Sequence, residues 1–171
     1  NPQVISTLIK KGAAIDTVNK SGKNVLFYAV EKKNLAFISE LLKHNIDINK
    51  QDRNGFTVLH NALRLKSPEI AKKLLNEGAD PSIQTYRTRN NPLHICIQLG
   101  LLDPDIIENV LNKLTINQCS NRGENALHMC MKAGISQIIP EILHQGIDVL
   151  AKTKQQESVL HLAIRKNQIQ C

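Results

Sequence analysis

The sequence predicts an all-α fold, a solenoid of stacked helix–turn–helix units with protruding hairpin loops. One short motif recurs five times along the 171 residues. In four copies a second motif precedes it by 14 or 15 residues; its first residues are Gly12, Asn45, Gly78 and Gly146. Apolar residues at helical spacing follow the first motif, whereas the stretch from the second motif to the next first motif has no helical period. Each unit is therefore predicted to contain helices and an extended loop.

The first motif is centred on a Leu that is followed by His in four of its five copies and, three positions on, by Ala or Cys. This Leu recurs at intervals of 33, 34, 34 and 33 residues, as Leu26, Leu59, Leu93, Leu127 and Leu160. The small residue suits the close approach of stacked helices. A spacing this regular is the signature of a repeat architecture.

Each first helix is predicted to begin after a polar residue whose side chain can accept hydrogen bonds from the N–H groups of the first turn. These capping residues are Asn24, Thr57, Asn91, Asn125 and Ser158. Asn91 is followed by Pro92, which suits the first helical position. In the second copy, Leu59, Ala62 and Leu63 have the spacing of a buried helical face.

The second helices show the same kind of start and a glycine at their end. Ser67-Pro68 and Asp103-Pro104 combine a cap with Pro, and Asn34 stands at the equivalent place. Inward-facing side chains in one second helix are predicted to be Ile70, Leu74 and Leu75. Second helices are predicted to end at Gly78 and Gly146. The hairpin loops are predicted to turn at Gly22, Gly55 and Gly123.

This pair of motifs resembles the ankyrin-repeat family, whose unit has about 33 residues and a Thr-Pro-Leu-His-x-Ala signature. Residues 52–60 and 74–80 match best, and the third unit departs most, with Arg89 in place of the turn glycine and Leu114 in place of the glycine after the second helix. The resemblance implies one ankyrin-repeat array over residues 1–171. Its complete repeats would be 19–51, 52–85, 86–119 and 120–152, with partial repeats at 1–18 and 153–171.

The two ends of this array are predicted to lack the polar faces that terminal repeats carry. Val4 and Leu8 at one end and Leu162 at the other are expected to lie uncovered. These positions favour a segment of a longer protein.

Composition argues against several classes of protein. Aromatic residues make up 3% of the chain, too few for the stacking platforms that bind single-stranded nucleic acid, so nucleic acid is not an expected partner. No apolar run approaches the roughly 18 residues of a membrane span. The cysteines Cys96, Cys119, Cys130 and Cys171 show no CxxC spacing. Free thiols in a reducing, intracellular and cytoplasmic setting are therefore expected.

No catalytic, cofactor or metal site is predicted, so the segment is not expected to be an enzyme. Paired-carboxylate sites and nucleophile, phosphate-loop and zinc-protease motifs are missing from the sequence. The motif histidines, His60, His94, His128 and His161, should lie roughly 10 Å apart, too far to share a metal ion. The resemblance implies that they are structural and bond loop backbone between repeats. Cys96 and Cys130 occupy the small buried position and are expected to behave as small hydrophobes.

Positive charge is expected to gather on one surface. The net charge is +7, yet predicted hairpin tips and exposed first-helix positions hold 12 of the 22 basic residues against three acidic ones, Glu31, Glu124 and Glu157. The predicted partner-binding residues are Lys20, Lys23, Arg53, Arg64, Arg87, Arg89, Arg122, Lys132, Lys154 and Arg165. Lys32 and Lys166 complete the twelve. In a solenoid these positions would line a concave surface.

The sequence thus favours a non-catalytic scaffold that binds an acidic protein or peptide through a basic concave groove. One alternative is binding of an anionic lipid or polyanion by the same residues, with steep salt dependence. Another is a regulatory ankyrin segment of a larger enzyme, effector or channel. A scatter of solvated loop cations is the remaining alternative.

Overall fold

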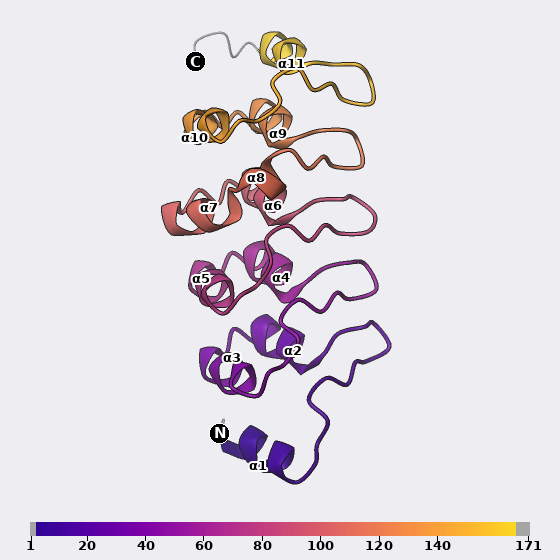
Figure 1. Cartoon of the computed structure of the whole chain (residues 1–171), viewed down its shortest axis with the longest axis vertical. Helices are drawn as coiled ribbons and strands as arrows, with labels where there is room; N and C mark the ends of the chain where they lie inside the picture. Colours follow the sequence, from indigo (N-terminus) through magenta and orange to yellow (C-terminus); the bar gives the residue numbers. More distant parts are fainter. Residues whose placement is uncertain (1–2, 167–171) are drawn as a thin grey trace. The chain divides into compact units, whose positions relative to one another are not determined.

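The computed structural model describes residues 3–166, which form short α-helices joined by loops (Figure 1). Within this range Lys152 and Ser158 form an isolated antiparallel β-bridge. The chain divides into two compact units, residues 1–80 and 81–171. The predicted all-α fold is confirmed.

The first unit consists of α1 (Gln3–Lys10), α2 (Val25–Glu31), α3 (Leu35–Leu42), α4 (Val58–Arg64) and α5 (Pro68–Asn76). α2 packs on α3 and α4 packs on α5, so each forms a helix–turn–helix pair. α2 also packs on α4, and α1 on α3. First helices therefore stack on first helices, and α1 lies where a second helix belongs.

The second unit consists of α6 (Pro92–Leu99), α7 (Pro104–Val110), α8 (Lys113–Ile116), α9 (Ala126–Ala133), α10 (Ile139–His144) and α11 (Val159–Arg165). α6 pairs with α7 and α9 pairs with α10, while α6, α9 and α11 stack in order. The hairpin loops of this unit project from the side of α6 and α9 opposite α7 and α10 (Figure 1).

The predicted caps of all five first helices are confirmed. Each capping side chain accepts a hydrogen bond from a backbone N–H of the first turn, in Asn24, Thr57, Asn91, Asn125 and Ser158. Asn34 and Asp103 cap α3 and α7 in the same way. Ser67 precedes α5 as predicted, but its hydroxyl does not cap the helix; it donates instead to the Leu65 carbonyl, 3.4 Å away.

The core lies between the stacked helices and follows the predicted register, with two corrections. Leu59 is fully buried and Leu127 is 4% exposed, whereas Leu75 is only half-buried. Leu162, expected to be uncovered, is 1% exposed, and Leu160 is instead 73% exposed. The reason is the packing of α11 on α9, which covers one face of α11 and leaves the opposite face open.

The third repeat closes its second helix differently from the others. α7 ends at Val110, Leu111 adopts an extended conformation (ψ 96°), and the chain then forms the four-residue helix α8. The buried Thr115 hydroxyl donates to the Val110 carbonyl at 2.6 Å. Because this hydroxyl satisfies the helix end, no glycine is needed, and Leu114 lies 72% exposed on α8.

Candidate partner-binding surface

Each hairpin tip is held by a polar side chain at its base. The Ser120 hydroxyl accepts hydrogen bonds from the backbone N–H groups two and four positions on, at 3.2 and 3.4 Å. The Asp52 carboxylate does the same in the first unit, at 2.8 and 3.0 Å. These local turns hold the tips in one backbone conformation.

The turn residue of every hairpin has a left-handed backbone. The φ values are 80°, 82°, 54°, 76° and 62° for Gly22, Gly55, Arg89, Gly123 and Gln156. The three predicted turn glycines are confirmed. Arg89 and Gln156 adopt the same conformation although a side chain disfavours it.

Neighbouring hairpin tips are joined by backbone hydrogen bonds. The N–H of one tip donates to the carbonyl of the preceding tip. The donor–acceptor pairs are Arg53 to Ser21 (2.9 Å) in the first unit, and Asn121 to Thr88 (2.7 Å) and Lys154 to Arg122 (2.8 Å) in the second. Three successive tips of the second unit therefore form one connected edge.

Six of the predicted binding residues lie exposed on these tips. They are Lys20 and Arg53 in the first unit, and Arg87, Arg89, Arg122 and Lys154 in the second. Within the described residues none of the six forms an ion pair. Their charges are thus not neutralised by a neighbouring side chain of the described residues.

The other four predicted residues, Lys23, Arg64, Lys132 and Arg165, each contact another side chain of the same repeat. We call this contact the brace. A brace joins the residue directly before each first-helix cap to the residue eight positions later. The braces are Lys23–Glu31 (2.5 Å), the Phe56 ring with the Arg64 guanidinium (4.7 Å to the ring centre), Asn90–Gln98 (3.2 Å), Glu124–Lys132 (2.5 Å) and Glu157–Arg165 (2.5 Å). Lys32 and Lys166 lie exposed at the C-caps of α2 and α11.

Sequence reasoning missed these braces. It counted Glu31, Glu124 and Glu157 as acids opposing the basic surface, whereas each neutralises one of its cations. Opposite charges eight residues apart in three of the five repeats were the signal that could have revealed them.

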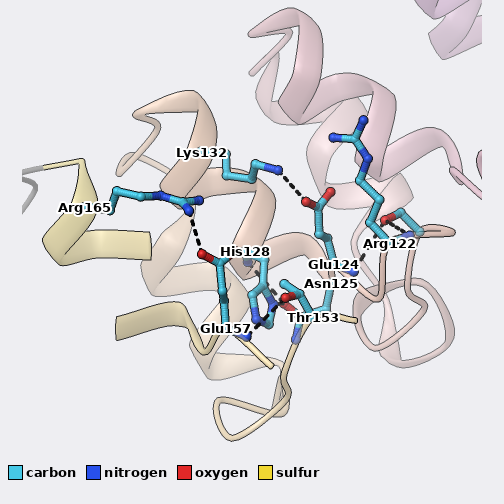
Figure 2. A network of polar contacts seen from close by, with 9 residues as sticks. Arg122, Glu124, Asn125, His128, Lys132, Thr153, Glu157 and Arg165 are labelled. Carbon is cyan, nitrogen blue, oxygen red and sulfur yellow. Dashed lines mark hydrogen bonds and ion pairs between the residues drawn. The ribbon is translucent and has the colours of Figure 1, made fainter. Parts of the chain in front are cut away.

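A shallow hollow lies beside Arg122 in the second unit. It has a volume of about 270 Å³ and is lined by Gln98, Arg122, Glu124, Met129, Lys132 and Ala133. Figure 2 shows the Arg122 guanidinium extending past the Glu124–Lys132 brace without an ion-pair partner. An unpaired cation therefore stands at the edge of this hollow.

The motif histidines belong to the caps of their own helices. Nδ1 of His94 accepts a hydrogen bond from the Asn91 backbone N–H at 3.3 Å, and Nδ1 of His128 lies 2.6 Å from the Asn125 side-chain oxygen. The Nε2 atoms of both rings are buried and have no hydrogen-bond partner. The loop backbone nevertheless lies beside both rings, at Gln118 for His94 and at Glu157 and Ala151 for His128, where the family resemblance implies it.

Burial keeps these rings neutral. It lowers the pKa of His94 to about 4, an effect that a contact with the Gln118 backbone partly opposes. Burial also lowers the pKa of His128. Among residues 3–166, no three His, Cys, Asp or Glu side chains are grouped so that they could hold a metal ion.

The described cysteines are free thiols that ionise poorly. Burial raises the pKa values of Cys96 and Cys130 to about 12, and it also raises the pKa of the half-buried Cys119. Cys171 lies outside the described residues. These environments disfavour the thiolate that a nucleophile or metal ligand requires.

Among the described helices, none combines the length and apolar character needed to cross a membrane.

The sequence is similar to ankyrin-repeat proteins of several organisms. A putative ankyrin repeat protein of Acanthamoeba polyphaga mimivirus is 27% identical over 155 residues, covering 86% of this chain and 19% of the relative. Alpha-latrotoxin-Lg1a of Latrodectus geometricus is 29% identical over 163 residues, with 94% and 12% covered. Mouse Rabankyrin-5 is 26% identical over 163 residues, with 91% and 14% covered. The chain thus spans less than a fifth of the length of these relatives.

The fold is also shared with solved structures. The ankyrin repeat domain of Bcl-3 superimposes with a TM-score of 0.81 at 21% identity, covering 94% of this chain and 72% of that domain. A Bdellovibrio bacteriovorus chain, from the complex of the Bd0816 predatory endopeptidase with its immunity protein, gives a TM-score of 0.80 at 22% identity, with 96% and 86% covered. The family model for ankyrin repeats matches residues 1–85 and 93–171. The chain therefore belongs to the ankyrin-repeat family, whose repeats are protein-interaction modules.

Proposed function

We propose that this chain is a non-catalytic scaffold segment that binds an acidic partner protein or peptide through the exposed cations of its hairpin tips. The observation that carries the proposal is the connected edge of the second unit. Three successive tips present Arg87, Arg89, Arg122 and Lys154 with no ion pair among the described residues. Lys20 and Arg53 form a smaller set of the same kind in the first unit.

The rigidity of the edge favours binding. Cations on fixed backbone lose less conformational freedom on binding than cations on a mobile loop. Arg also offers a planar fork that matches a carboxylate. The braced residues Lys23, Arg64, Lys132 and Arg165 would support a partner from the helix side, but their existing contacts reduce the charge that they can offer.

A charge-reversal experiment tests the proposal. The probe is a fluorescein-labelled deca-glutamate peptide, with binding followed by fluorescence anisotropy. The triple variant Arg87→Glu, Arg122→Glu, Lys154→Glu should bind at least about tenfold more weakly, because each exposed ion pair contributes roughly 0.2–1 kcal/mol and its replacement adds repulsion. Its melting temperature should stay near that of the parent chain, because these side chains make no internal ion pair.

The matched control is Lys10→Glu, Lys11→Glu, Lys50→Glu, which changes the net charge equally at exposed positions outside the hairpin tips. This control should bind the peptide almost as the parent chain does. Equal loss in both triple variants would show that only net charge matters and would refute the proposal. Tighter binding of phosphatidylserine vesicles or heparin than of the peptide, lost in the first variant alone, would favour a lipid or polyanion ligand.

We further propose that the segment works inside a larger protein in a reducing, intracellular compartment, rather than as an enzyme in its own right. The length of the relatives supports a place inside a larger protein. The free thiols support a reducing compartment, and the raised pKa of Cys96 disfavours a cysteine nucleophile. The association of the full-length protein with its partner can be measured with and without the changes Arg87→Glu, Arg122→Glu and Lys154→Glu. This measurement distinguishes a docking segment from an autonomous regulatory switch.

A further inference from the structure

The second helices of the second unit enclose a hollow on the side opposite the hairpin tips. It lies between α7 and α10 and has a volume of about 440 Å³. Its apolar lining comes from Leu102, Ile107, Leu111 and Ile138. This volume falls within the range of small-ligand pockets, about 300–1,000 Å³.

The unusual third repeat contributes to the lining of the hollow. Because α7 ends at Val110, Leu111 lies in extended chain and its side chain joins the lining instead of continuing a helix.

The rim of the hollow is acidic. Glu108 and Glu141 are exposed lining residues, and neither carboxylate forms a hydrogen bond or ion pair among the described residues. Residues 101–112 and 135–147 together hold four acidic residues and no Lys or Arg. An apolar pocket with two unpaired carboxylates on its rim is complementary to an apolar group flanked by cations.

The equivalent hollow of the first unit has different chemistry, although it has a similar volume of about 460 Å³. Between α3 and α5, Lys72 and Lys73 line it together with Glu69 and Glu77, and the Lys73–Glu77 ion pair measures 3.3 Å. The acidic rim and apolar floor are thus particular to the second unit and are not a general property of paired second helices.

We propose that the hollow between α7 and α10 is a second docking site, which takes a short segment of a partner protein with one or two large apolar side chains flanked by Lys or Arg. The apolar side chains enter between Ile107 and Ile138, and the cations meet Glu108 and Glu141. This ligand has the opposite charge to the one proposed for the hairpin tips, so either proposal can fail without the other.

The test is a titration of the whole chain, followed by amide NMR, with the capped peptide Ala-Lys-Leu-Leu-Lys-Ala. Amide signals of residues 102–111 and 137–145 should shift. They should shift far less with Ala-Glu-Leu-Leu-Glu-Ala, which reverses the charge, and with Ala-Lys-Ala-Ala-Lys-Ala, which lacks the leucines.

Glu141→Lys should weaken binding of the leucine–lysine peptide by roughly two- to fivefold and strengthen binding of its glutamate counterpart. Glu69→Lys is the matched control, because Glu69 is also an exposed first-turn acid of a second helix. It should leave both affinities unchanged. Shifts that ignore the charge of the peptide, or no shift in either stretch, would overturn the proposal. Concentration-dependent self-association abolished by Glu141→Lys would also overturn it, because the occupant would then be a second copy of the chain.

Discussion

Replacing Gly123 by Ala should weaken the link between two hairpin tips. Gly123 has φ of 76°, and a Cβ there would lie 3.0 Å from the Lys154 nitrogen and 3.3 Å from the Thr153 carbonyl carbon. The left-handed conformation alone costs Ala about 1–2 kcal/mol. The neighbouring backbone must also move, which disturbs the 2.8 Å hydrogen bond from Lys154 to Arg122 and adds about 0.5–1.5 kcal/mol. We expect a total loss of about 1.5–3.5 kcal/mol.

Gly146→Ala separates the two contributions. Gly146 lies in the same unit with φ of 81°, but a Cβ there would meet nothing within 4 Å. It should lose only the conformational part, about 1–2 kcal/mol. Urea denaturation of both variants measures the difference, and hydrogen exchange at the Lys154 amide reports the link directly. Equal losses in the two variants, with unchanged exchange at Lys154, would refute the close-approach argument.

Three further predictions concern the turn, the core and a buried histidine. Arg89→Gly should stabilise the chain by about 0.5–1 kcal/mol, since Gly adopts its φ of 54° freely, while weakening deca-glutamate binding; urea denaturation and anisotropy check both effects. Leu59→Ala and Leu127→Ala should each lose about 2–5 kcal/mol, whereas Leu160→Ala, at the same motif position but 73% exposed, should lose less than about 1 kcal/mol in thermal melts. The pKa of His94 in the folded chain, about 4, is below its ordinary value of 6.5, so its contribution to stability is complete above pH 6.5 and is lost as the pH falls toward 4. That contribution is roughly 3 kcal/mol, and the unfolding free energy of His94→Gln should therefore depend less on pH over this interval.

The features predicted correctly from the sequence are those that depend on near neighbours. Asn91 caps α6 by accepting from an N–H three residues away, and Gly123 suits the left-handed backbone of its own turn. Such interactions leave a fixed spacing in the sequence. The repeat period then places each motif, which explains why the helix starts and the fold class could be predicted.

The features that were missed depend on contacts that span more than one helical turn, or on which faces of two helices meet. The sequence shows Leu114 in the place of a glycine, but the closing bond from Thr115 to Val110 arises only once α8 has formed. The sequence predicts a free charge on Lys132, but in the structure the carboxylate of Glu124 lies 2.5 Å from its ammonium group. Burial of Leu162 in place of Leu160 likewise depends on which face of α11 meets α9.

The braces keep the same pair of positions in each repeat, while the type of side-chain contact at that pair differs. One position pair is occupied by an ion pair at Lys23–Glu31, by the reversed polarity at Glu157–Arg165, by an amide pair at Asn90–Gln98 and by an aromatic–guanidinium stack at Phe56–Arg64. The stack leaves one net positive charge on the surface, whereas the other versions leave none. Mutation can therefore exchange one version for another and retune the electrostatics of the surface repeat by repeat, while the helix and hairpin beneath keep their places. This interchangeability makes the array evolvable, and it offers protein engineers a set of modular parts for adjusting partner preference.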